Sequence, residues 1–468
     1  MQKGVVDFIT LGCSKNLVDA ERVMRQLEAV GWTCVHDPEE PKGEVCVVNT
    51  CGFIGDAKEE SINVILQMAE RKKKGKLKTL IVMGCLSERY RAELEKELPE
   101  VDAYFGKFDF GGIVERLNKN RFAEGQKTKD KTLSVGCSSY ERKLTTPKHY
   151  AYLKISEGCN RMCSYCAIPL ITGRHTSRPK EEILAEVRWL VSQGVKELNV
   201  IAQDLSSYGL DLKGDGTRKT GHGKHLLPEL IDEIAHVKGV EWIRLHYAYP
   251  TDFPEELLDV MAKNENVCKY LDIALQHCTD HMLSLMRRHI TRAEQDALIR
   301  KIRERVPGIC IRTTLMVGHP GETEEDFEEL KAWTREMRFD RMGAFAYSDE
   351  EGTYANKHYK DDVPEEVKQA RLSELMAIQQ EISGELMQRF VRRTEKVVID
   401  RQEGDYLIGR TQYDSPEVDC EVLIEKLRVL SPREARLFES LELREGDFVE
   451  VKITKAEEFD LYGEIIGS

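Results

Sequence analysis

Three cysteines share one short loop that directly follows an apolar segment of the chain. Residues 150–155 are predicted to form a strand, and Cys159, Cys163 and Cys166 follow it with the spacing C-x3-C-x2-C. Three thiolates gathered by one loop are typical of a 4Fe–4S cluster, which normally takes four cysteine ligands. Three protein ligands leave one iron open, so a substrate or cofactor can bind to it directly. The rest of the fold has to be consistent with this loop.

Structural zinc is the alternative interpretation of the loop. A structural zinc site is closed by four ligands, and no further Cys or His follows at a suitable spacing except His175. A single histidine at this position is more often an ordinary polar loop residue. The iron–sulfur cluster is therefore the better interpretation.

The length and composition are those of a protein with several globular domains. The 468 residues exceed what one hydrophobic core supports, and about three domains are expected. No apolar run is long enough to cross a membrane, and residues 1–10 lack the apolar region of a signal peptide, so a cytoplasmic protein is predicted. In that compartment thirteen cysteines indicate metal or redox chemistry rather than a disulfide framework.

The net charge of the chain indicates which class of partner it binds. The net charge is −13, whereas a nucleic-acid-binding protein usually presents a basic face. RNA or DNA is therefore disfavoured as the main partner, and a basic protein suits the balance better. Two short basic runs, at 71–74 and 287–289, are predicted to lie on solvated faces.

The N-terminal part alternates strands with helices. Predicted strands at 5–11, 44–50 and 79–83 are each followed by a turn and a helical pattern, such as the one at 56–74. This alternation predicts a parallel sheet, whose ligands gather beyond the carboxyl ends of the strands.

Three cysteines occupy equivalent positions in this N-terminal pattern. Cys13, Cys51 and Cys85 each lie one to three residues past a predicted strand, so they are expected to meet at one sheet edge. Ordinary burial in the core explains Cys34 and Cys46, which lie within elements. It does not explain three cysteines at matching places, so we predict a second three-cysteine cluster site.

The central part repeats strand and helix after a polar, lysine-rich linker at 122–148. Six strands are predicted, at 151–155, 197–202, 241–246, 271–275, 309–316 and 341–346. Helix starts are marked by the capping boxes at Thr291 and Thr323 and by Ser177 before Pro179. Six units of this kind predict a partial (βα)6 TIM-type barrel with its chemistry at the carboxyl ends of the strands.

Several polar residues lie at these predicted strand ends. They are Gln203, Asp204, His246, Tyr247, Gln276, His277, Gly318 and Glu322. Residues at this edge of such a barrel are candidates to line its active site. The alternative is that each is an ordinary loop or capping group.

The C-terminal part follows a long predicted helix at 364–392. Short alternating strands at 396–400, 406–410, 448–453 and 461–466 predict a small β-barrel. Residues 394–468 carry 19 acidic and 10 basic side chains. A surface this negative repels phosphate and attracts Lys/Arg-rich protein.

The loop at Cys159 resembles the signature of the radical S-adenosylmethionine (SAM) enzymes. The resemblance implies that the open iron chelates the amino and carboxylate groups of SAM, and that an electron from the cluster cleaves SAM to a 5′-deoxyadenosyl radical. It also implies that Tyr165 packs against the adenine of SAM. The cofactor contacts that it implies at the strand ends are Gln203, Asp204, Gln276, Gly318 and Glu322, with His277 as a catalytic candidate near the substrate.

The whole chain resembles the methylthiotransferase family within this group. Leu-Gly-Cys-Ser-Lys-Asn at 11–16, Asn-Thr-Cys-Gly-Phe-Ile at 49–54 and Gly-Cys-Leu at 84–86 carry the resemblance, and the C-terminal β-barrel resembles a TRAM domain. Met-Arg-Arg at 286–288 also resembles a family motif, so a role in the active-site region is the alternative to a solvated face for that basic run. These motifs are similar to the branch that modifies small-subunit ribosomal protein S-twelve. The tRNA-modifying branch typically has Cys-Gln-Met-Asn at the first site, and this chain departs from that pattern.

The resemblance implies two 4Fe–4S clusters and two molecules of SAM. One SAM would donate a methyl group to sulfur at the N-terminal cysteines, and the second would give the radical that abstracts hydrogen from the β-carbon of an aspartyl residue. The substrate would be a basic ribosomal protein, with an electron donor and a sulfur carrier of unknown identity. The alternatives are a tRNA adenosine methylthiotransferase and a non-catalytic metal-binding module.

These patterns together predict an α/β protein of three domains. Residues 1–121 form the N-terminal cluster domain, 122–148 the linker, 149–392 the radical SAM domain and 393–468 the TRAM-like β-barrel.

Overall fold

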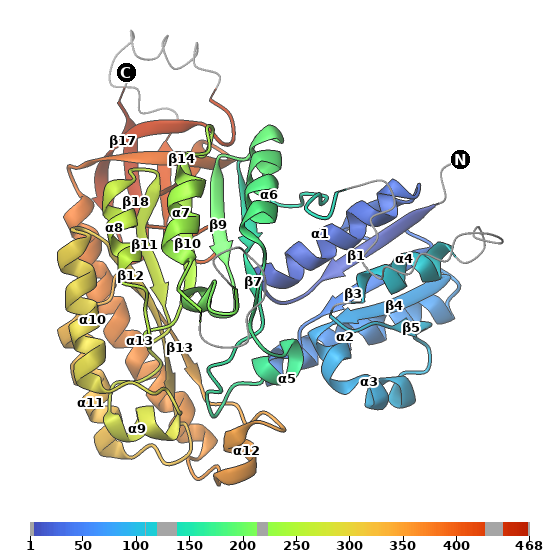
Figure 1. The fold of residues 1–468 in the computed structure, drawn as a ribbon, viewed down its shortest axis with the longest axis horizontal. Helices are drawn as coiled ribbons and strands as arrows, with labels where there is room; N and C mark the ends of the chain where they lie inside the picture. The colour runs from blue at the N-terminus through green and yellow to red at the C-terminus, as the bar shows by residue number, and fades with distance from the viewer. Residues whose placement is uncertain (1–3, 108, 119–137, 213–222, 426–442, 467–468) are drawn as a thin grey trace.

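The computed structural model describes residues 4–107, 109–118, 138–212, 223–425 and 443–466. Within them, two parallel α/β units lie side by side, and a small β-barrel adjoins the central one (Figure 1). The helices of this described part include none that is long and apolar enough to cross a membrane.

The N-terminal unit is a five-stranded parallel sheet in the order β2-β1-β3-β4-β5. Its strands are β1 (Val5–Thr10), β2 (Thr33–His36), β3 (Val45–Thr50), β4 (Thr79–Gly84) and β5 (Ala103–Tyr104). Helices α1 (Ser14–Ala29) and α4 (Phe110–Asn118) pack on one face, and α2 (Gly55–Lys73) and α3 (Cys85–Glu97) pack on the other. The three predicted strands are confirmed, whereas the short edge strands β2 and β5 were not predicted.

The central unit is a six-stranded parallel sheet in the order β13-β12-β11-β10-β9-β6, which stays open between its two edges. Its strands are β6 (Tyr150–Lys154), β9 (Glu197–Ile201), β10 (Trp242–Ala248), β11 (Val267–Ile273), β12 (Cys310–Val317) and β13 (Arg341–Ala346). The main helices are α6 (Lys180–Ser192), α7 (Leu227–Ala235), α8 (Glu256–Lys263), α10 (Arg292–Arg305), α11 (Glu324–Met337) and α13 (Glu365–Met387). The predicted partial (βα)6 barrel is confirmed.

Shorter elements lie at the carboxyl ends of these strands or beside them. They are β7 (Ser156–Glu157), α5 (Ile168–Thr172), β8 (Thr176–Ser177), η1 (Leu205–Ser207), α9 (Asp280–Leu285), α12 (Tyr354–His358) and η2 (Gln388–Phe390). The capping boxes at Thr291 and Thr323 are confirmed. The predicted cap at Ser177 is wrong, because its hydroxyl accepts a hydrogen bond from the Gly209 N–H and Pro179 is the N-cap of α6.

The C-terminal unit is a closed five-stranded barrel in the order β14-β15-β16-β18-β17. Its strands are β14 (Thr394–Glu403), β15 (Tyr406–Thr411), β16 (Glu421–Glu425), β17 (Phe448–Ala456) and β18 (Asp460–Ile465). Closure leaves no unpaired strand edge. The four predicted strands are confirmed, and β16 was not predicted.

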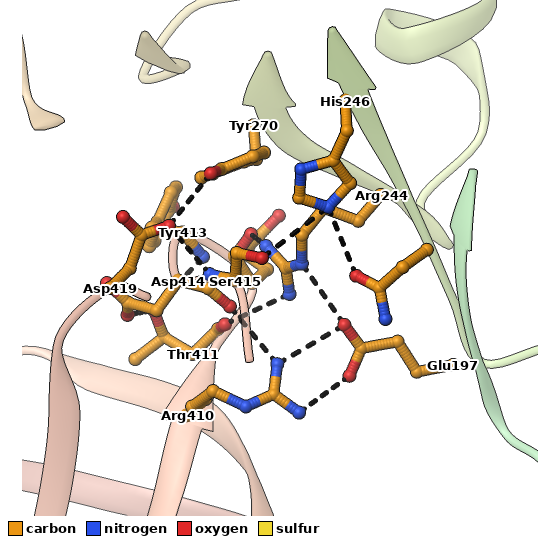
Figure 2. Close-up of polar contacts among 12 residues, drawn as sticks. Glu197, Arg244, His246, Tyr270, Arg410, Thr411, Tyr413, Asp414, Ser415 and Asp419 are labelled. Carbon is orange, nitrogen blue, oxygen red and sulfur yellow. Dashed lines mark hydrogen bonds and ion pairs between the residues drawn. The ribbon is translucent and has the colours of Figure 1, made fainter. Parts of the chain in front are cut away.

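The loop between β15 and β16 lies against the inner face of the central sheet. Glu197 of β9 accepts hydrogen bonds from Arg410 at 2.8 Å and from Arg244 at 3.1 Å (Figure 2). Each of the six central strands contributes a side chain to this contact. These side chains are Tyr150, Glu197, Arg244, Tyr270, Arg312 and Arg341. The C-terminal barrel is therefore an integral part of the central unit.

Buried carboxylates join the N-terminal unit to the central one. Glu186 of α6 is fully buried and pairs with Arg178 at 2.7 Å and with Arg142 at 3.1 Å. Arg142 also binds Glu21 of α1, and Arg22 of α1 lies 3.6 Å from Glu186. Within the predicted linker, residues 122–137 lie outside the described part, whereas 138–148 pack along α1 through these contacts.

We expect Glu186→Gln to lower the free energy of unfolding by about 3–5 kcal/mol, because it leaves buried arginines without their shared counter-charge. Burial raises the pKa of Glu186, but Arg178, Arg142 and Arg22 outweigh it and lower the pKa to about 2. The stabilisation is therefore complete above about pH 4.5, the ordinary value for Glu, and is lost as the pH falls toward 2.

Denaturant unfolding at pH 7 and at lower pH measures this difference. Glu182→Gln is the matched control, because Glu182 pairs with Arg178 at 3.0 Å but its side chain is 34% exposed. This control should cost at most about 1 kcal/mol. Equal losses of unfolding free energy for the two variants would contradict the conclusion that Glu186 joins the N-terminal and central units.

Candidate functional site

The first candidate site lies at the carboxyl ends of three adjacent N-terminal strands. Cys13 follows β1, Cys51 follows β3 and Cys85 begins α3 directly after β4, and these strands are neighbours in the sheet. Gly12 has a φ of 95°, and a Cβ built on it would lie 2.9 Å from the Cβ of Cys51. Glycine therefore allows the first two cysteine loops to approach closely.

Asn16 ties the three loops of this site together. Its amide donates to the carbonyl oxygens of Leu11 at 3.2 Å and Thr50 at 3.1 Å. Its side-chain oxygen accepts a hydrogen bond from the Cys85 thiol at 3.5 Å. The fourth residue of the Cys-Ser-Lys-Asn segment thus has a structural role that the sequence pattern did not indicate.

The surroundings of this site act differently on its three thiols, and only Cys13 has a lowered pKa. Burial raises the pKa of Cys85 to about 12, and the negative charges of Cys13 and Cys51 add to that effect, so the three groups lie within electrostatic reach of one another. Desolvation also raises the pKa of Cys13, but Lys15, Lys107 and backbone N–H donors outweigh it and lower this pKa overall. Cationic side chains therefore face the thiols from two directions.

The second candidate site is the loop at Cys159, which begins two residues after β7. The Arg161 backbone N–H donates to the Cys159 sulfur at 3.5 Å. Burial raises the pKa of Cys159 to about 12, with contributions from Asp204 and from the nearby Cys163. These three thiols, like the first three, lie within electrostatic reach of one another.

Arg288 is the cation of this second site. It is 2% exposed, and its guanidinium donates to the Cys163 sulfur at 3.4 Å and to the Tyr165 hydroxyl at 3.3 Å. Its Nε is buried without a hydrogen-bond partner in the described part of the chain. The prediction that the basic run at 287–289 lies on a solvated face is therefore wrong for Arg288.

The donor chemistry of each set of three thiols suits an iron–sulfur cluster. Thiolates are the ligands of such clusters. In the described residues, no three Cys, His, Asp or Glu side chains come close enough to hold one ion. The Nε of Arg288 has no partner in the described chain, while another nitrogen of the same guanidinium donates to Cys163, so this Nε is available as a donor to a group bound at the site.

The two cysteine sets face each other across the seam between the N-terminal and central units. Cys85 packs against Ala167 and Ile171, which lie just after Cys166 in the sequence. Lys107 of the N-terminal unit pairs at 3.0 Å with Glu157, two residues before Cys159. The structure thus brings together six cysteines that are spread over residues 13–166.

A cavity of about 590 Å³ opens beside these sites. It lies between residues 53–56 of the N-terminal unit and the carboxyl ends of β12 and β13, and both Tyr165 and Gln276 line it. The Oε1 of Gln276 is buried without a partner in the described chain. A cavity of this size suits a small-molecule ligand.

The other predicted contact residues lie elsewhere around the cysteine loop. Asp204 pairs with Arg161 at 2.7 Å, and Gln203 donates to Glu157. Glu322 is buried, and its carboxylate accepts hydrogen bonds from the Gly318 N–H at 2.7 Å and from Arg371 at 2.6 Å. None of these residues lines the cavity. Their contact with a cofactor remains a prediction.

His277 is fully buried and does not line the cavity either. Its Nε2 lies 3.3 Å from Glu322, and its backbone immediately follows Gln276. A catalytic role for this histidine remains a prediction.

Three family models match the chain. The model of the uncharacterized protein family UPF0004 matches residues 5–106, that of the radical SAM superfamily matches 153–334, and that of the TRAM domain matches 391–466. Among solved structures, the radical S-adenosylmethionine methyltransferase TsrM from Kitasatospora setae has a TM-score of 0.52 at 14% identity, over 74% of this chain and 72% of that one. At this identity the likeness concerns the fold alone.

Relatives with high identity extend over the full chain. A Phocaeicola vulgatus protein named ribosomal protein uS12 methylthiotransferase RimO is 59% identical over 466 residues, which is 100% of each chain. Proteins of the same name from Porphyromonas gingivalis and Christiangramia forsetii are 55% and 48% identical, and the matches cover 100% and 99% of this chain and 100% and 95% of theirs. The chain therefore belongs to the RimO family of radical SAM methylthiotransferases, enzymes that transfer a methylthio group.

Proposed function

We propose that this enzyme adds a methylthio group to the β-carbon of an aspartyl residue in small-subunit ribosomal protein uS12, using two 4Fe–4S clusters and two molecules of SAM. The observation that carries the proposal is the pair of three-cysteine sets facing each other across one seam. The relatives named for uS12 support the choice of substrate. Membership of an enzyme family overturns the alternative of a non-catalytic metal-binding module.

Cys159, Cys163 and Cys166 would hold one cluster, and Cys13, Cys51 and Cys85 the other. Together with SAM, the bound clusters supply the radical chemistry that an unactivated C–H bond needs, because no His or Glu can remove its hydrogen as a proton. Tyr165 and Gln276 would bind the adenosyl part of SAM in the cavity that they line.

Side chains at the seam position the two sites and exclude water. Glu350, after β13, is 3% exposed and accepts hydrogen bonds from Arg89 and Lys58 of the N-terminal unit, both at 2.8 Å. Arg89 also donates to the Gly52 carbonyl beside Cys51 at 3.2 Å. These contacts hold the first cysteine set against the carboxyl edge of the central sheet.

The acidic C-terminal barrel favours a basic protein over RNA as the partner. Residues 394–468 carry 19 acidic and 10 basic side chains, and this net negative charge repels phosphate even though some of the acids, such as Asp414 and Asp419, pair with the central sheet. A ribosomal substrate would place the reaction in the cytoplasm. An electron donor and a sulfur carrier are further partners. The charge of the C-terminal barrel does not indicate which proteins they are.

Anaerobically reconstituted enzyme tests the substrate directly. Incubated with SAM, a reductant and either uS12 or tRNA, it should give a methylthio adduct on an aspartyl residue of uS12, together with 5′-deoxyadenosine. Mass spectrometry of both substrates detects the adduct. An adduct on tRNA and none on uS12 would move the enzyme to the tRNA adenosine methylthiotransferases.

Arg288 gives a second test of the site. Removing its charge in Arg288→Gln should lower the reduction potential of the cluster at Cys163 by on the order of 100 mV, because a nearby cation favours the added electron. The potential is measured by redox titration with electron paramagnetic resonance.

Arg287→Gln is the matched control for this charge change. Arg287 lies 4.3 Å over the Tyr354 ring, and no contact joins it to a thiol in the described residues. This control should leave the potential nearly unchanged. Equal shifts in the two variants would show that Arg288 does not act through its contact with Cys163.

A further inference from the structure

Lys15 is a buried lysine without an anionic partner. It lies two residues after Cys13 and is 7% exposed, and its ammonium lies 3.2 Å from the centre of the Tyr247 ring. Throughout the described ranges, no hydrogen bond or ion pair joins this ammonium to another residue. The Nζ atom itself keeps some contact with solvent, and a bound anion that replaces this water would pair with the ammonium.

Three other cations around the two cysteine sets, Lys107, Lys154 and Arg161, already pair with carboxylates. Lys107 and Lys154 share the carboxylate of Glu157, at 3.0 and 2.8 Å, and Arg161 pairs with Asp204 at 2.7 Å. The nearby acids are therefore occupied by other cations. Among these four described cations, only the Lys15 ammonium has no hydrogen-bond partner within the described part of the folded chain. It can therefore bind a group that the chain itself does not supply.

Tyr247 fixes the direction in which this ammonium faces. It lies near the carboxyl end of β10 with a φ of 64°, and its N–H donates to Asp272 at 3.2 Å. The preceding His246 lies near Asn199 and Ser415, at 3.3 and 3.5 Å (Figure 2). The Tyr247 ring is 36% exposed, so Lys15 is held over a partly open surface of the central unit.

We propose that the Lys15 ammonium binds the side-chain carboxylate of the aspartyl residue that is modified. This inference rests on the proposed function and adds a specificity-determining residue to it. In an aspartyl side chain the carboxylate carbon is bonded to the β-carbon. An ion pair at Lys15 therefore fixes the carboxylate to which the reacting β-carbon is directly bonded, beside the loop that carries Cys13. A neutral side chain at the target position forms no such pair.

Two forms of uS12 test this ion pair, one with the natural aspartate and one with asparagine at the modified position. The wild-type enzyme should prefer the aspartate form by at least about 30-fold in kcat/KM and should bind it more tightly in calorimetry, because an unpaired buried charge is expensive. Lys15→Gln should reduce both preferences to a few-fold. Lys15→Arg should restore part of them, because it keeps the charge.

Two further measurements keep the result interpretable. Lys15→Gln should retain its iron content and should still form 5′-deoxyadenosine from SAM, which shows that both sites remain assembled. A Lys15→Gln enzyme that keeps the full preference for aspartate would overturn the inference. An equal loss of kcat/KM with both forms of uS12 would also overturn it, because Lys15 would then act on the sulfur or on the charge of the cluster and not on the substrate carboxylate. Failure of the wild-type enzyme to modify uS12 would instead overturn the proposed function.

Discussion

Buried carboxylates that each bind several cations hold the two α/β units in a single arrangement. Glu186 faces Arg178, Arg142 and Arg22, and Glu157 binds Lys107 and Lys154. Buried charges of this kind are stable only when the geometry of the pairs is satisfied. If one unit moved relative to the other, these buried charges would lose their partners. The interface between the two units therefore opposes such a movement. The position of the first cysteine set relative to the second depends on this seam.

The C-terminal barrel stabilises the opposite side of the central sheet. Strand β15 and the loop after it place Arg410 and Asp414 against buried charges of the strands, including Glu197 and Arg341. A (βα)6 sheet stays open, and its inner face carries polar groups that need partners. The barrel supplies these partners. It therefore belongs to the scaffold of the active site as well as offering an acidic surface to a partner.

The sequence predicted most of the fold and the six cysteines. The predicted strands were long apolar runs with clear ends, and topology alone brings their carboxyl ends to one edge. The strands that were not predicted have two to five residues: β2, β5 and β16 form through pairing with longer neighbours, and β7 and β8 pair with each other. Their residues carry little periodicity of their own.

The charged residues of the site could not be predicted in the same way. Arg288 and Lys15 stand among other polar residues in the sequence, and local patterns treat such residues as exposed. Their burial arises because distant segments close over them. Asn16 and Glu186 likewise gain their roles from partners on other elements.

Iron content and product analysis of cysteine variants test most directly the claim that two facing clusters serve one reaction. Anaerobically reconstituted wild-type enzyme should contain about eight irons, and a variant with Cys13, Cys51 and Cys85 changed to alanine about four. This variant should still form 5′-deoxyadenosine but no methylthio adduct, whereas Cys46→Ala should keep both activities. About four irons in the wild type, or an adduct from the triple variant, would contradict the account.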